Sequence, residues 1–502
     1  PVLIKASAGG GGRGMRLVER AVEIAGALSS AKAEARSAYG DDAVLLEKYI
    51  ANPRHLEVQI IGDQHGNVLH LFERDCSVQR NNQKVIEEAP APHLPDAVRK
   101  KLVDAALSLG RAIGYVSAGT IEFIMEAGDD QPYFLEMNTR LQVEHPVTEA
   151  ITGLDLVEWQ LRVAAGLSLP LTQDQIVARG HAIEVRLAAE RPDLGFQPSV
   201  GTFLDVEAPP GLRFDTGVAS GSEIGLHYDS MIAKLIAHGP DRPSAVRRLR
   251  EGLDSLVLLG PATNQAFLKD CLSEEEFAEG RATTRFLARA FPDGWSPNPD
   301  ALARVRAEAV AAALSSRAEA AVWHRRSGFR VMGRRRGAKV WADVADEYGK
   351  SSVVLTAADG HLSASHEGRS VDLGRLEDAG SVNAVCTPGT GDAETADVLA
   401  TAGGLSIHAT TSLSVEAVKR SEADAASDSN LVAPLPGVIS SIAVQVGDRV
   451  ARGDTALQME AMKLVHTLAV AREGRVTPAP GAVGARFNPG TMLVEIAPHE
   501  ET

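Results

Sequence analysis

The sequence predicts three folded regions in series: a mixed α/β region over residues 1–291, a small β domain over residues 323–411 and a duplicated β sandwich over residues 431–498. Three observations support this division. Short β-branched runs alternate with helical patterns up to about residue 291. A Pro-rich break follows at residues 295–299, and a set of glycines recurs at a fixed spacing in the last seventy or so residues.

In the α/β region, residues 58–61 and 182–185 have the composition of strands, and residues 97–113 have the apolar spacing of an amphipathic helix. The first four residues, Pro1-Val2-Leu3-Ile4, have the composition of a buried strand, with no turn or polar segment before them. We therefore expect the region to be incomplete here, with its first subdomain, an N-terminal lobe, missing.

The middle of the chain changes character twice. Residues 292–322 form a linker and an Ala- and Arg-rich helical segment that begins at 301. Apolar runs at residues 328–332, 339–344, 353–357 and 406–410, separated by Gly, Asp and Ser, then predict the small β domain. Residues 412–430 are polar and end in a non-periodic Ala/Ser/Asp-rich stretch, which predicts a flexible linker that tethers the last domain.

The last domain contains an internal repeat of 37 positions. Its first half carries Gly437, Gly447 and Gly453, and the second half repeats them as Gly474, Gly484 and Gly490. Two similar halves predict a pseudo-symmetric β sandwich. The tetrapeptide Glu460-Ala461-Met462-Lys463 lies where the first half leads into the second, which a symmetric fold places at an exposed hairpin. A lysine in an arbitrary hairpin is usually a solvated charge, so its context decides whether Lys463 has a function.

Composition excludes several classes of protein. Hydrophobic residues make up 44% and charged residues 23% of the chain, which is typical of a folded globular protein. A net charge of -15 disfavours binding to nucleic acid or an anionic membrane, so any phosphate that the protein binds should be small. Its 3 cysteines lack the spacing of a metal site or a disulfide framework, and no apolar run is long enough for a membrane span. We expect a cytoplasmic protein, or a mitochondrial matrix protein in a eukaryote.

A glycine-rich segment near the start is a candidate phosphate-binding loop. Lys5 precedes the run Gly9-Gly10-Gly11-Gly12-Arg13-Gly14, whose backbone can bring N–H groups against phosphate oxygens. The run satisfies the dinucleotide fingerprint only by chance, and it fails the Walker A pattern because the lysine comes before the glycines. Taken alone, such a run is more often a plain flexible loop.

A polar ladder at residues 136–144 is the strongest functional signal in the α/β region. If the segment is one strand, its even positions share a face that carries Glu136, Asn138, Arg140, Gln142 and Glu144. Glu136 and Asn138, together with Glu122, would supply the hard oxygen ligands that Mg²⁺ prefers while it binds nucleotide phosphates. Arg140 would then face an anion. The alternative is a solvated edge strand, which explains the alternation but not the order of the charges.

Several motifs in order resemble those of biotin carboxylase, an ATP-grasp enzyme, and the resemblance covers residues 1 to about 290. They are the Lys5–Met15 loop, residues 47–50 and 53–55, residues 74–79, residues 87–90, and the ladder at 136–144. The resemblance implies a fold, an activity and a set of site residues. It implies that the ATP phosphates are bound by Lys5, Gly11 and Gly12. It also implies that the ribose lies near His55 and Gln79. The adenine would be held by Glu47, Lys48, Tyr49 and Ile50.

The same resemblance implies the reacting groups. Lys84 would position bicarbonate and phosphate, and Mg²⁺ or Mn²⁺ would be bound by Glu122, Glu136 and Asn138. Glu144 would be the base for a bicarbonate held by Arg140, Gln142 and Val143. Bicarbonate would attack ATP to give carboxyphosphate, and Arg186 would stabilise the biotin enolate. One position departs from the family pattern: Asn82, preceded by Asn81, stands where a histidine that contacts the nucleotide is usual.

Residues 431–498 resemble the biotinyl carrier domain, which implies that Lys463 carries covalent biotin. A lipoyl domain shares the duplication, but its lysine usually lies in an Asp-Lys-Ala setting; here Leu464 follows Lys463, where a second Met is frequent. After residue 300 we find no second catalytic domain for carboxyl transfer. The chain thus resembles the α subunit of acyl-CoA carboxylases of the methylcrotonyl-, geranyl- and propionyl-CoA type, in which the middle β domain contacts the β subunit.

The resemblance implies a hetero-oligomer with a carboxyltransferase β subunit, and it implies biotin protein ligase and bicarbonate as further partners. The tetrapeptides at residues 323–326 and 463–466 favour the methylcrotonyl or geranyl branch over the propionyl or acetyl branch. Two alternatives stay open. One is another ATP-grasp ligase that makes an acyl-phosphate, and the other is a binding protein in which a degenerate ATP site merely accompanies the carrier.

Overall fold

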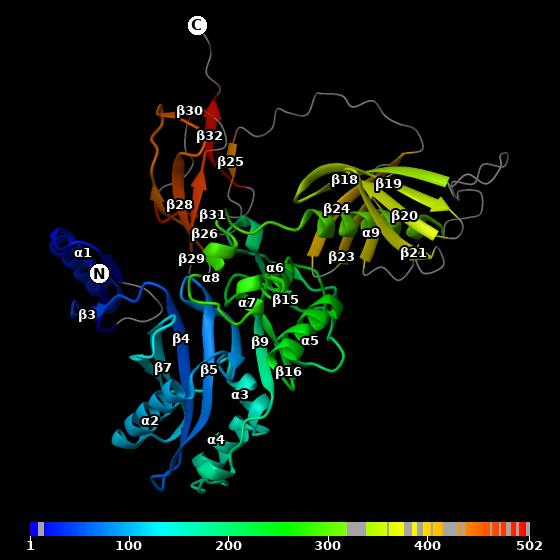
Figure 1. Ribbon diagram of the computed structural model, residues 1–502. Helices are drawn as coiled ribbons and strands as arrows, with labels where there is room; N and C mark the ends of the chain where they lie inside the picture. The colour runs from blue at the N-terminus through cyan, green and yellow to red at the C-terminus, as the bar shows by residue number, and fades with distance from the viewer. Residues whose placement is uncertain are drawn as a thin grey trace.

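The structure is a computed structural model that describes residues 1–8, 15–318, 338–358, 361–375, 384–388, 395–402, 405–414, 430–432, 437–461, 464–470, 473–477, 483–487 and 491–497. Figure 1 shows, in chain order, an N-terminal lobe in dark blue, a long twisted sheet that runs with its helices from blue through cyan to green, a yellow sheet folded on one helix, and an orange-red sandwich. Among the described residues, no helix combines the length and the apolar character needed to cross a bilayer.

The N-terminal lobe is a small antiparallel sheet covered by one helix. Its strands, with β1 in the middle, are β1 (Val2–Ala6), β2 (Arg16–Val18) and β3 (Val44–Lys48). The helix α1 (Ile24–Tyr39) packs Ala31 against Ile4. It ends at Gly40, which has a φ of 73°, a conformation that glycine adopts without strain. The strand expected at the start of the chain is confirmed.

An eight-stranded antiparallel sheet, in the order β14-β16-β9-β6-β5-β4-β7-β8, forms the body of the α/β region. Its strands are β4 (Pro53–Gly62), β5 (Val68–Arg80), β6 (Gln83–Ala89), β7 (Ser117–Glu126), β8 (Tyr133–Asn138), β9 (His181–Ala188), β14 (Arg213–Thr216) and β16 (Met231–Gly239). The strands expected at residues 58–61 and 182–185 lie within β4 and β9.

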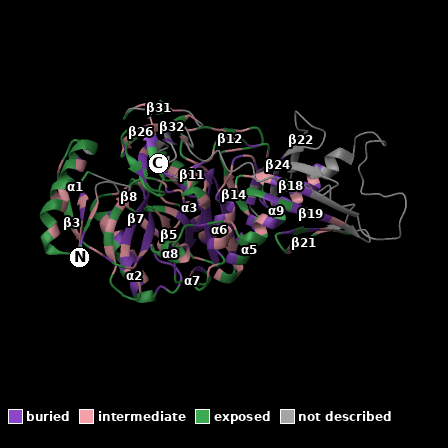
Figure 2. Ribbon diagram, turned by 90° about the horizontal axis from the view of Figure 1, so that it is seen from above, coloured by how far each residue is buried: buried purple, intermediate pink, exposed green. Residues whose placement is uncertain are grey.

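Helices cover both faces of this sheet. On one face, α2 (Asp96–Ala112) packs Leu102 against Leu56, Val58 and Ile60, which confirms the helix expected at residues 97–113. On the other face, α3 (His145–Thr152) packs its apolar side chains against β6, β9 and β16, and α4 (Leu156–Ala164) follows it. The inner strands of this sheet, from β16 to β7, are therefore buried along most of their length, as the purple ribbons of Figure 2 show. The edge strands β14 and β8 are only partly buried, and α1 is mostly exposed.

The region up to residue 295 is completed by short strands and helices around an aromatic-rich core. Phe203, Phe267, Phe277, Phe286 and Trp295 are buried in it. The strands are β10 (Glu190–Arg191), β11 (Gln197–Pro198), β12 (Gly201–Thr202), β13 (Asp205–Glu207), β15 (Glu223–Ile224) and β17 (Val257–Leu259). The helices are α5 (Arg242–Ser255), α6 (Gln265–Cys271), α7 (Glu275–Ala278) and α8 (Phe286–Ala290).

The middle domain is a seven-stranded antiparallel sheet in the order β21-β20-β19-β18-β24-β23-β22, with α9 (Pro299–Ala318) packed on it. Its strands are β18 (Ala338–Asp346), β19 (Gly349–Ala358), β20 (His361–His366), β21 (Arg369–Arg375), β22 (Ala384–Pro388), β23 (Thr395–Ala402) and β24 (Leu405–Ser414). The strands expected at 339–344, 353–357 and 406–410 are present; the run at 328–332 lies outside the described residues.

The helix α9, which the sequence suggested as part of a linker, shares its core with this sheet. Val305 and Val310 are fully buried against strand residues such as Leu355 and Ile407. Arg306, which is 4% exposed, donates two hydrogen bonds to the carboxylate of Asp346, at 2.6 and 2.8 Å. The folding unit therefore includes the helix.

The last domain is the expected sandwich of two four-stranded sheets, β25-β32-β30-β27 and β29-β28-β26-β31. Its strands are β25 (Asn430–Val432), β26 (Gly437–Ile442), β27 (Arg449–Val450), β28 (Thr455–Ala461), β29 (Leu464–Ala469), β30 (Gly474–Thr477), β31 (Arg486–Phe487) and β32 (Met492–Ala497). Strand β26 pairs with β31, and its repeat β30 pairs with β27, as a two-fold relation requires.

Backbone hydrogen bonds follow the same symmetry. The N–H of Gly447 donates to the carbonyl of Val476, and the N–H of Gly484 donates to the carbonyl of Ile439, both at 2.8 Å. Both glycines have positive φ, 96° and 90°, which explains why the repeat keeps glycine there. Strands β28 and β29 pair as far as Ala461 and Leu464, so residues 462 and 463 connect the two halves. Lys463 itself lies outside the described residues, as does residue range 415–429 of the expected linker.

Candidate active site

The two faces of β4 have opposite chemical character. Leu56, Val58 and Ile60 face the apolar side of α2, so the alternating residues His55, Glu57 and Gln59 face the other side of the sheet. These polar side chains are nonetheless buried, with Glu57 and Gln59 at 0% exposure. Buried charges need partners, and here neighbouring strands supply them.

Lys84, on β6, is the centre of the charged face. Its Nζ donates to Glu57 at 2.5 Å, to Glu144 at 2.6 Å and to Glu122 at 2.7 Å. Burial lowers the pKa of the Lys84 ammonium, but the surrounding carboxylates outweigh it and hold that pKa well above its usual range. For Glu57, burial alone would raise the pKa of the carboxyl. The charges of Arg74 and Lys84 outweigh burial and lower that pKa to about 2. Lys84 and Glu57 are therefore charged at neutral pH.

Glu144 lies between two cations. Its Oε1 accepts from Lys84, and its Oε2 accepts from Nη2 of Arg186 at 2.9 Å. Glu144 is 0% exposed and is the N-cap residue of α3, with Pro146 in the first turn of that helix. Arg186 in turn donates from Nε to Glu87 at 2.6 Å. The helix start and the two strands β6 and β9 thus fix a carboxylate that is paired on both sides.

The expected strand over residues 136–144 is wrong. Strand β8 ends at Asn138, and the chain then turns, so Glu144 lies at the start of α3 and not on a strand. Gln142 reaches Glu122 because the chain turns, and not because the two residues share the face of a strand. The Nε2 of Gln142 donates to Oε1 of Glu122 at 3.3 Å. Arg140 is exposed, and among the described residues its guanidinium donates only to the neighbouring Leu141 carbonyl. Proline two residues after Glu144 favours a helix start over a continuing strand.

The candidate metal ligands lie on the last two strands of the sheet. Glu122 on β7 and Glu136 on β8 are direct cross-strand neighbours. The amide of Asn138 donates to Glu122 at 3.0 Å and to Glu136 at 3.5 Å. Burial raises the pKa of Glu122, but His55 and Lys84 lower it to about 2, so the carboxylate is charged. Two carboxylates and an amide within one small space fit a hard divalent cation.

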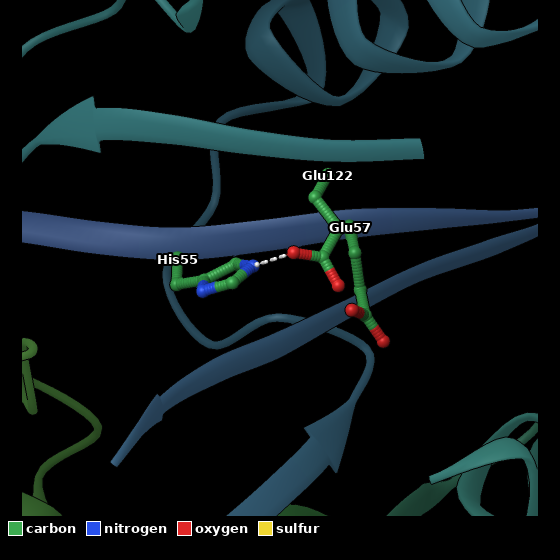
Figure 3. A group of neighbouring side chains, drawn as sticks. All are labelled: His55, Glu57 and Glu122. Carbon is green, nitrogen blue, oxygen red and sulfur yellow. Dashed lines mark ion pairs between the residues drawn. The ribbon is translucent and has the colours of Figure 1, made fainter. Parts of the chain in front are cut away.

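A second group of potential ligand atoms, from His55, Glu57 and Glu122, lies just beside these residues (Figure 3). The Nε2 of His55 is 3.0 Å from Oε2 of Glu122, and its Nδ1 accepts from the amide of Gln79 at 2.7 Å. The ammonium of Lys84 contacts both carboxylates of the group. Because this ammonium is already bonded to both carboxylates and offsets part of their charge, the trio is better described as an ion-pair network.

Arg74 ties the charged face to α3. It is completely buried and donates to Glu57 at 2.5 Å, to Gln59 at 2.8 Å, to Thr148 of α3 at 2.9 Å and to Thr120 at 3.1 Å. Because Thr148 is in the same helix that Glu144 begins, Arg74 holds Glu57 and the helix of Glu144 in one unit.

The N-terminal lobe carries the other predicted nucleotide contacts. Lys5 and Glu47 form an ion pair of 2.7 Å across β1 and β3, and Lys48 donates to the hydroxyl of Tyr133 at 3.0 Å. The hydroxyl of Tyr49 accepts from Arg285 at 2.7 Å, and Ile50 is buried. Gly11 and Gly12 lie outside the described residues, so the phosphate-binding role of the loop stays a prediction.

Asn82 sits in a tight hairpin turn. Strands β5 and β6 pair as far as Arg80 and Gln83, which leaves Asn81 and Asn82 as the two turn residues. Both have positive φ, 49° and 63°, and asparagine tolerates this conformation better than most residues. The turn geometry therefore gives a physical reason for asparagine here, and the Asn82 side chain is exposed.

Sequence reasoning assigned no role to several buried groups of this face. They are Glu57, Arg74, Glu87, Glu184 and Lys234. Lys234, for example, donates from Nζ to the carbonyl of Val143 at 2.7 Å and so fixes the backbone just before Glu144. A detectable signal was present for three of them: Glu57, Glu184 and Lys234 each lie between two apolar neighbours within a strand, where an unpaired charge would be too costly.

Comparisons with known proteins agree with this geometry. Residues 1–172 match the family described as "Carbamoyl-phosphate synthase L chain, ATP binding domain". Residues 184–289 match the biotin carboxylase C-terminal domain. Residues 429–496 match the family described as "Biotin-requiring enzyme". Methylcrotonoyl-CoA carboxylase subunit alpha of Rattus norvegicus is 38% identical, covering 100% of this chain and 72% of its own length. The propionyl-CoA carboxylase alpha chain of Ruegeria pomeroyi is also 38% identical, covering 99% and 77%.

Solved structures are similar over the α/β region. A biotin carboxylase from Campylobacter jejuni, in complex with an ATP compound, is 44% identical with a TM-score of 0.56, over 58% of this chain and 65% of that one. The biotin carboxylase domain of the Hydrogenobacter thermophilus 2-oxoglutarate carboxylase, solved with MgADP, ADP and bicarbonate, is 46% identical with a TM-score of 0.55, over 58% and 64%. With an ATP-grasp region and a biotinyl domain in one polypeptide, the chain belongs to the family of biotin-dependent acyl-CoA carboxylase α subunits.

Proposed function

We propose that this chain uses ATP and bicarbonate to carboxylate biotin on Lys463, which then delivers the carboxyl group to an acyl-CoA on a carboxyltransferase β subunit. The observation that carries the proposal is the fully buried carboxylate of Glu144, held between Lys84 and Arg186. A dry site with two fixed cations and one carboxylate is suited to bind a small anion and remove its proton.

The ion pairs of Glu144 place its carboxylate next to the two cations that would attract bicarbonate. Its Oε1 is bonded to Lys84 and its Oε2 to Arg186. An incoming bicarbonate would draw Lys84 and Arg186 toward itself. Glu144 would then take the bicarbonate proton and leave an oxygen nucleophile for the γ-phosphate of ATP, which gives carboxyphosphate and ADP.

Arg186 and Lys84 would then stabilise charge that develops during the reaction. When carboxyphosphate breaks down to CO₂ and phosphate, the phosphate accepts the proton of the biotin ring nitrogen. A fixed guanidinium beside the developing enolate oxygen lowers the barrier, because preorganised charge costs no reorganisation. Arg186 is suited to this role because Glu87 and Glu144 fix its orientation from two sides.

Glu122, Glu136 and Asn138 would hold Mg²⁺ or Mn²⁺, which would neutralise phosphate charge in the nucleotide. The residues fit a hard cation: Glu122 and Glu136 face each other across β7 and β8, and the amide of Asn138 contacts both. A half-turn of that amide would present its oxygen to the same point. Lys5, Gly11 and Gly12 would bind the nucleotide phosphates from the N-terminal lobe. Glu47, Lys48, Tyr49 and Ile50 would hold the adenine.

Partners follow from this assignment. The names of the relatives, subunit alpha and alpha chain, imply at least one other kind of subunit, and we infer that it is the carboxyltransferase β subunit. Biotin protein ligase would attach biotin to Lys463. We assign the protein to the cytoplasm, or to the mitochondrial matrix in a eukaryote, since Cys76 and Cys271 are buried free thiols, which suit a reducing compartment.

The identity of the acyl-CoA depends on that partner. The relatives named for methylcrotonoyl-CoA and for propionyl-CoA are equally identical to this chain, at 38%. We favour the methylcrotonyl or geranyl branch from the tetrapeptides at residues 323–326 and 463–466. The native complex, purified through its biotin, should carboxylate one acyl-CoA of a panel well ahead of the others, and a preference for propionyl-CoA would reverse this choice.

Two measurements test the proposed function as a whole. Avidin should detect biotin on the purified chain, and ATP cleavage by the native complex should depend on bicarbonate. A chain with biotin but without bicarbonate-dependent ATP cleavage would be a carrier with a degenerate ATP site. Bicarbonate-independent ATP cleavage that requires an amine or amino acid would point to another ATP-grasp ligase.

We predict that a fragment of residues 425–502 folds alone and accepts biotin from a biotin protein ligase. The sandwich has its own core, in which Ile439, Leu457, Met459, Val494 and Ile496 are at most 2% exposed. Mass spectrometry after incubation with ligase, biotin and ATP should show one biotin adduct, at Lys463. A folded fragment that remains unmodified would contradict the assignment of Lys463.

We predict that the middle domain binds the β subunit. Deletion of residues 299–414 should abolish co-purification of the two subunits while leaving bicarbonate-dependent ATP cleavage within about twofold, because the large sheet and its core do not include this segment. The deletion must include α9, since removing only residues 323–411 would expose the apolar side of that helix. Survival of the complex after the deletion would show that the β subunit binds elsewhere.

A further inference from the structure

Two buried glutamates lie next to Arg186, and one of them has no hydrogen-bond partner within the described part of the chain. Strands β6 and β9 pair so that Glu87 and Glu184 are opposite each other, and both side chains are 0% exposed. Side chains in opposite positions of an antiparallel pair lie on one face, with Cβ atoms about 5 Å apart. The two carboxyl groups therefore share one small, dry space.

Only one of the four carboxyl oxygens of this pair is hydrogen bonded within the described part of the chain. Oε1 of Glu87 accepts from Arg186, whereas Oε2 of Glu87 and both oxygens of Glu184 have no partner there. Most buried polar side-chain atoms are paired, and a buried ionised carboxylate without hydrogen bonds is expensive. A proton held between the two carboxyl groups would give their unpaired oxygens a hydrogen bond.

The charged groups around Glu184 leave it without a cation of its own. Its own strand contributes Arg186, which is bonded to Glu87 and Glu144. The other groups that face it are Glu87 and Lys84 from β6, Lys234 from β16, with its ion-pair partner Asp215 from β14, and Glu144 and His145 from the start of α3. Lys84 is bonded to three other carboxylates, and Lys234 donates to the Val143 carbonyl.

We propose that Glu184 keeps its proton at neutral pH and donates it to Oε2 of Glu87, so that the two glutamates together carry one negative charge. Glu87 is the charged member because Arg186 compensates it, and Glu184 is the neutral member because no cation is bonded to it. The proton stays on the pair and is not consumed. One hydrogen bond would satisfy the orphaned oxygen of Glu87 and one oxygen of Glu184.

Electrostatics around the pair support this arrangement. Burial, and then the charge of Glu87, raise the pKa of the Glu184 carboxyl well above its usual range. Burial also raises the pKa of Glu87, to about 7, although Arg186 acts in the opposite direction. Two carboxylates this close in a dry space cannot both ionise readily near neutral pH.

The shared proton affects the reaction through the position and the charge of Arg186, so this inference rests on the proposed function. A single charge on the pair orients the guanidinium and leaves part of its positive potential for the substrate. A second charge on Glu184 would pull Arg186 back toward the sheet and weaken that potential. Glu87 and Glu184 are thus positioning residues, and the reaction should lose rate at high pH, where the pair loses its proton.

The first test measures stability and is independent of activity. A carboxyl whose pKa is higher in the folded than in the unfolded state loses stability as the pH rises above the unfolded value of about 4.3. Glu184→Gln has no proton to lose, so the melting temperature of the wild-type protein should fall relative to this variant between pH 5 and pH 9. Glu73→Gln is the matched control: Glu73 is 1% exposed, is paired with Arg99 and has one orphaned oxygen outside the site.

The second test is the pH profile of bicarbonate-dependent ATP cleavage. The alkaline limb of kcat/KM should move up by about one pH unit or more in Glu184→Gln, because the variant pair keeps a single charge. Glu87→Gln should lower kcat by about 10²-fold, because Arg186 loses the carboxylate that orients it. Glu73→Gln should change neither quantity.

The outcomes separate this inference from the proposed function. If the wild-type complex shows no bicarbonate-dependent ATP cleavage, the proposed function fails while the stability test still applies. A melting-temperature difference that is constant with pH, or an unchanged alkaline limb, would overturn the shared proton. Should Glu184→Gln fail to fold, Glu87→Gln serves in the stability test. Without the charge of Glu87, Glu184 ionises at lower pH in the folded protein, so the decline of the melting temperature must end at lower pH and be smaller than in the wild-type protein.

Discussion

Lys463→Arg in the native complex is expected to abolish acyl-CoA carboxylation completely. Arginine keeps the positive charge but offers no amine that the ligase can join to biotin, so the chain should give no avidin signal. The ATP site lies in a separately packed region, and bicarbonate-dependent ATP cleavage should continue when free biotin is added at high concentration. The tether supplies biotin at an effective concentration of order millimolar, which free biotin must match.

Lys100→Arg is a suitable control for this variant. Lys100 is an exposed residue of α2 that pairs with Asp104, and it is far in the sequence from both the carrier and the ladder that leads to Glu144. The control should keep the biotin signal and the full rate of acyl-CoA carboxylation, measured as incorporation of labelled bicarbonate. Residual carboxylation by Lys463→Arg would show that biotin is attached at another lysine.

Much of the fold could be predicted because its periodicities are local. The repeat of 37 positions predicted the sandwich, and the structure pairs β26 with β31 and β30 with β27 as that repeat requires. The helix α9 was harder, since its Ala-rich sequence has apolar residues on several sides and suggests a connecting helix. Its burial depends on strands that come 20 to 110 residues later in the chain, which local periodicity does not register.

The candidate site shows a similar limit. Residues 136–144 alternate in type, but the alternation does not reveal that the strand ends at Asn138 and that Glu144 begins a helix. Ion pairs bring Glu122, Glu144, Lys84 and Arg186 together, and their chemical roles stay predictions. Glu57 and Arg74 were missed because their importance lies in pairing across strands, which sequence spacing does not encode.

Glu144→Gln is expected to lower the kcat of bicarbonate-dependent ATP cleavage by about 10²- to 10⁴-fold, the usual cost of removing a general base. Glutamine keeps the length and shape of the side chain, and its amide oxygen can still accept from Lys84 or Arg186. Those two cations keep other carboxylate partners, Glu57 and Glu122 for Lys84 and Glu87 for Arg186, so the fold should survive. Biotin attachment should be unchanged, because Lys463 lies in a different domain.

The prediction is specific because it assigns different effects to KM and to kcat. If Glu144 acts as the base, the KM for ATP should change by less than about threefold while kcat falls, because the nucleotide contacts predicted for Lys5 and Glu47 lie in another lobe. Glu73→Gln again provides the control, since it removes a buried, arginine-paired carboxylate of the same sheet outside the site. A rise in KM for bicarbonate with unchanged kcat would instead make Glu144 a binding residue, and the proton would have to leave bicarbonate by another route.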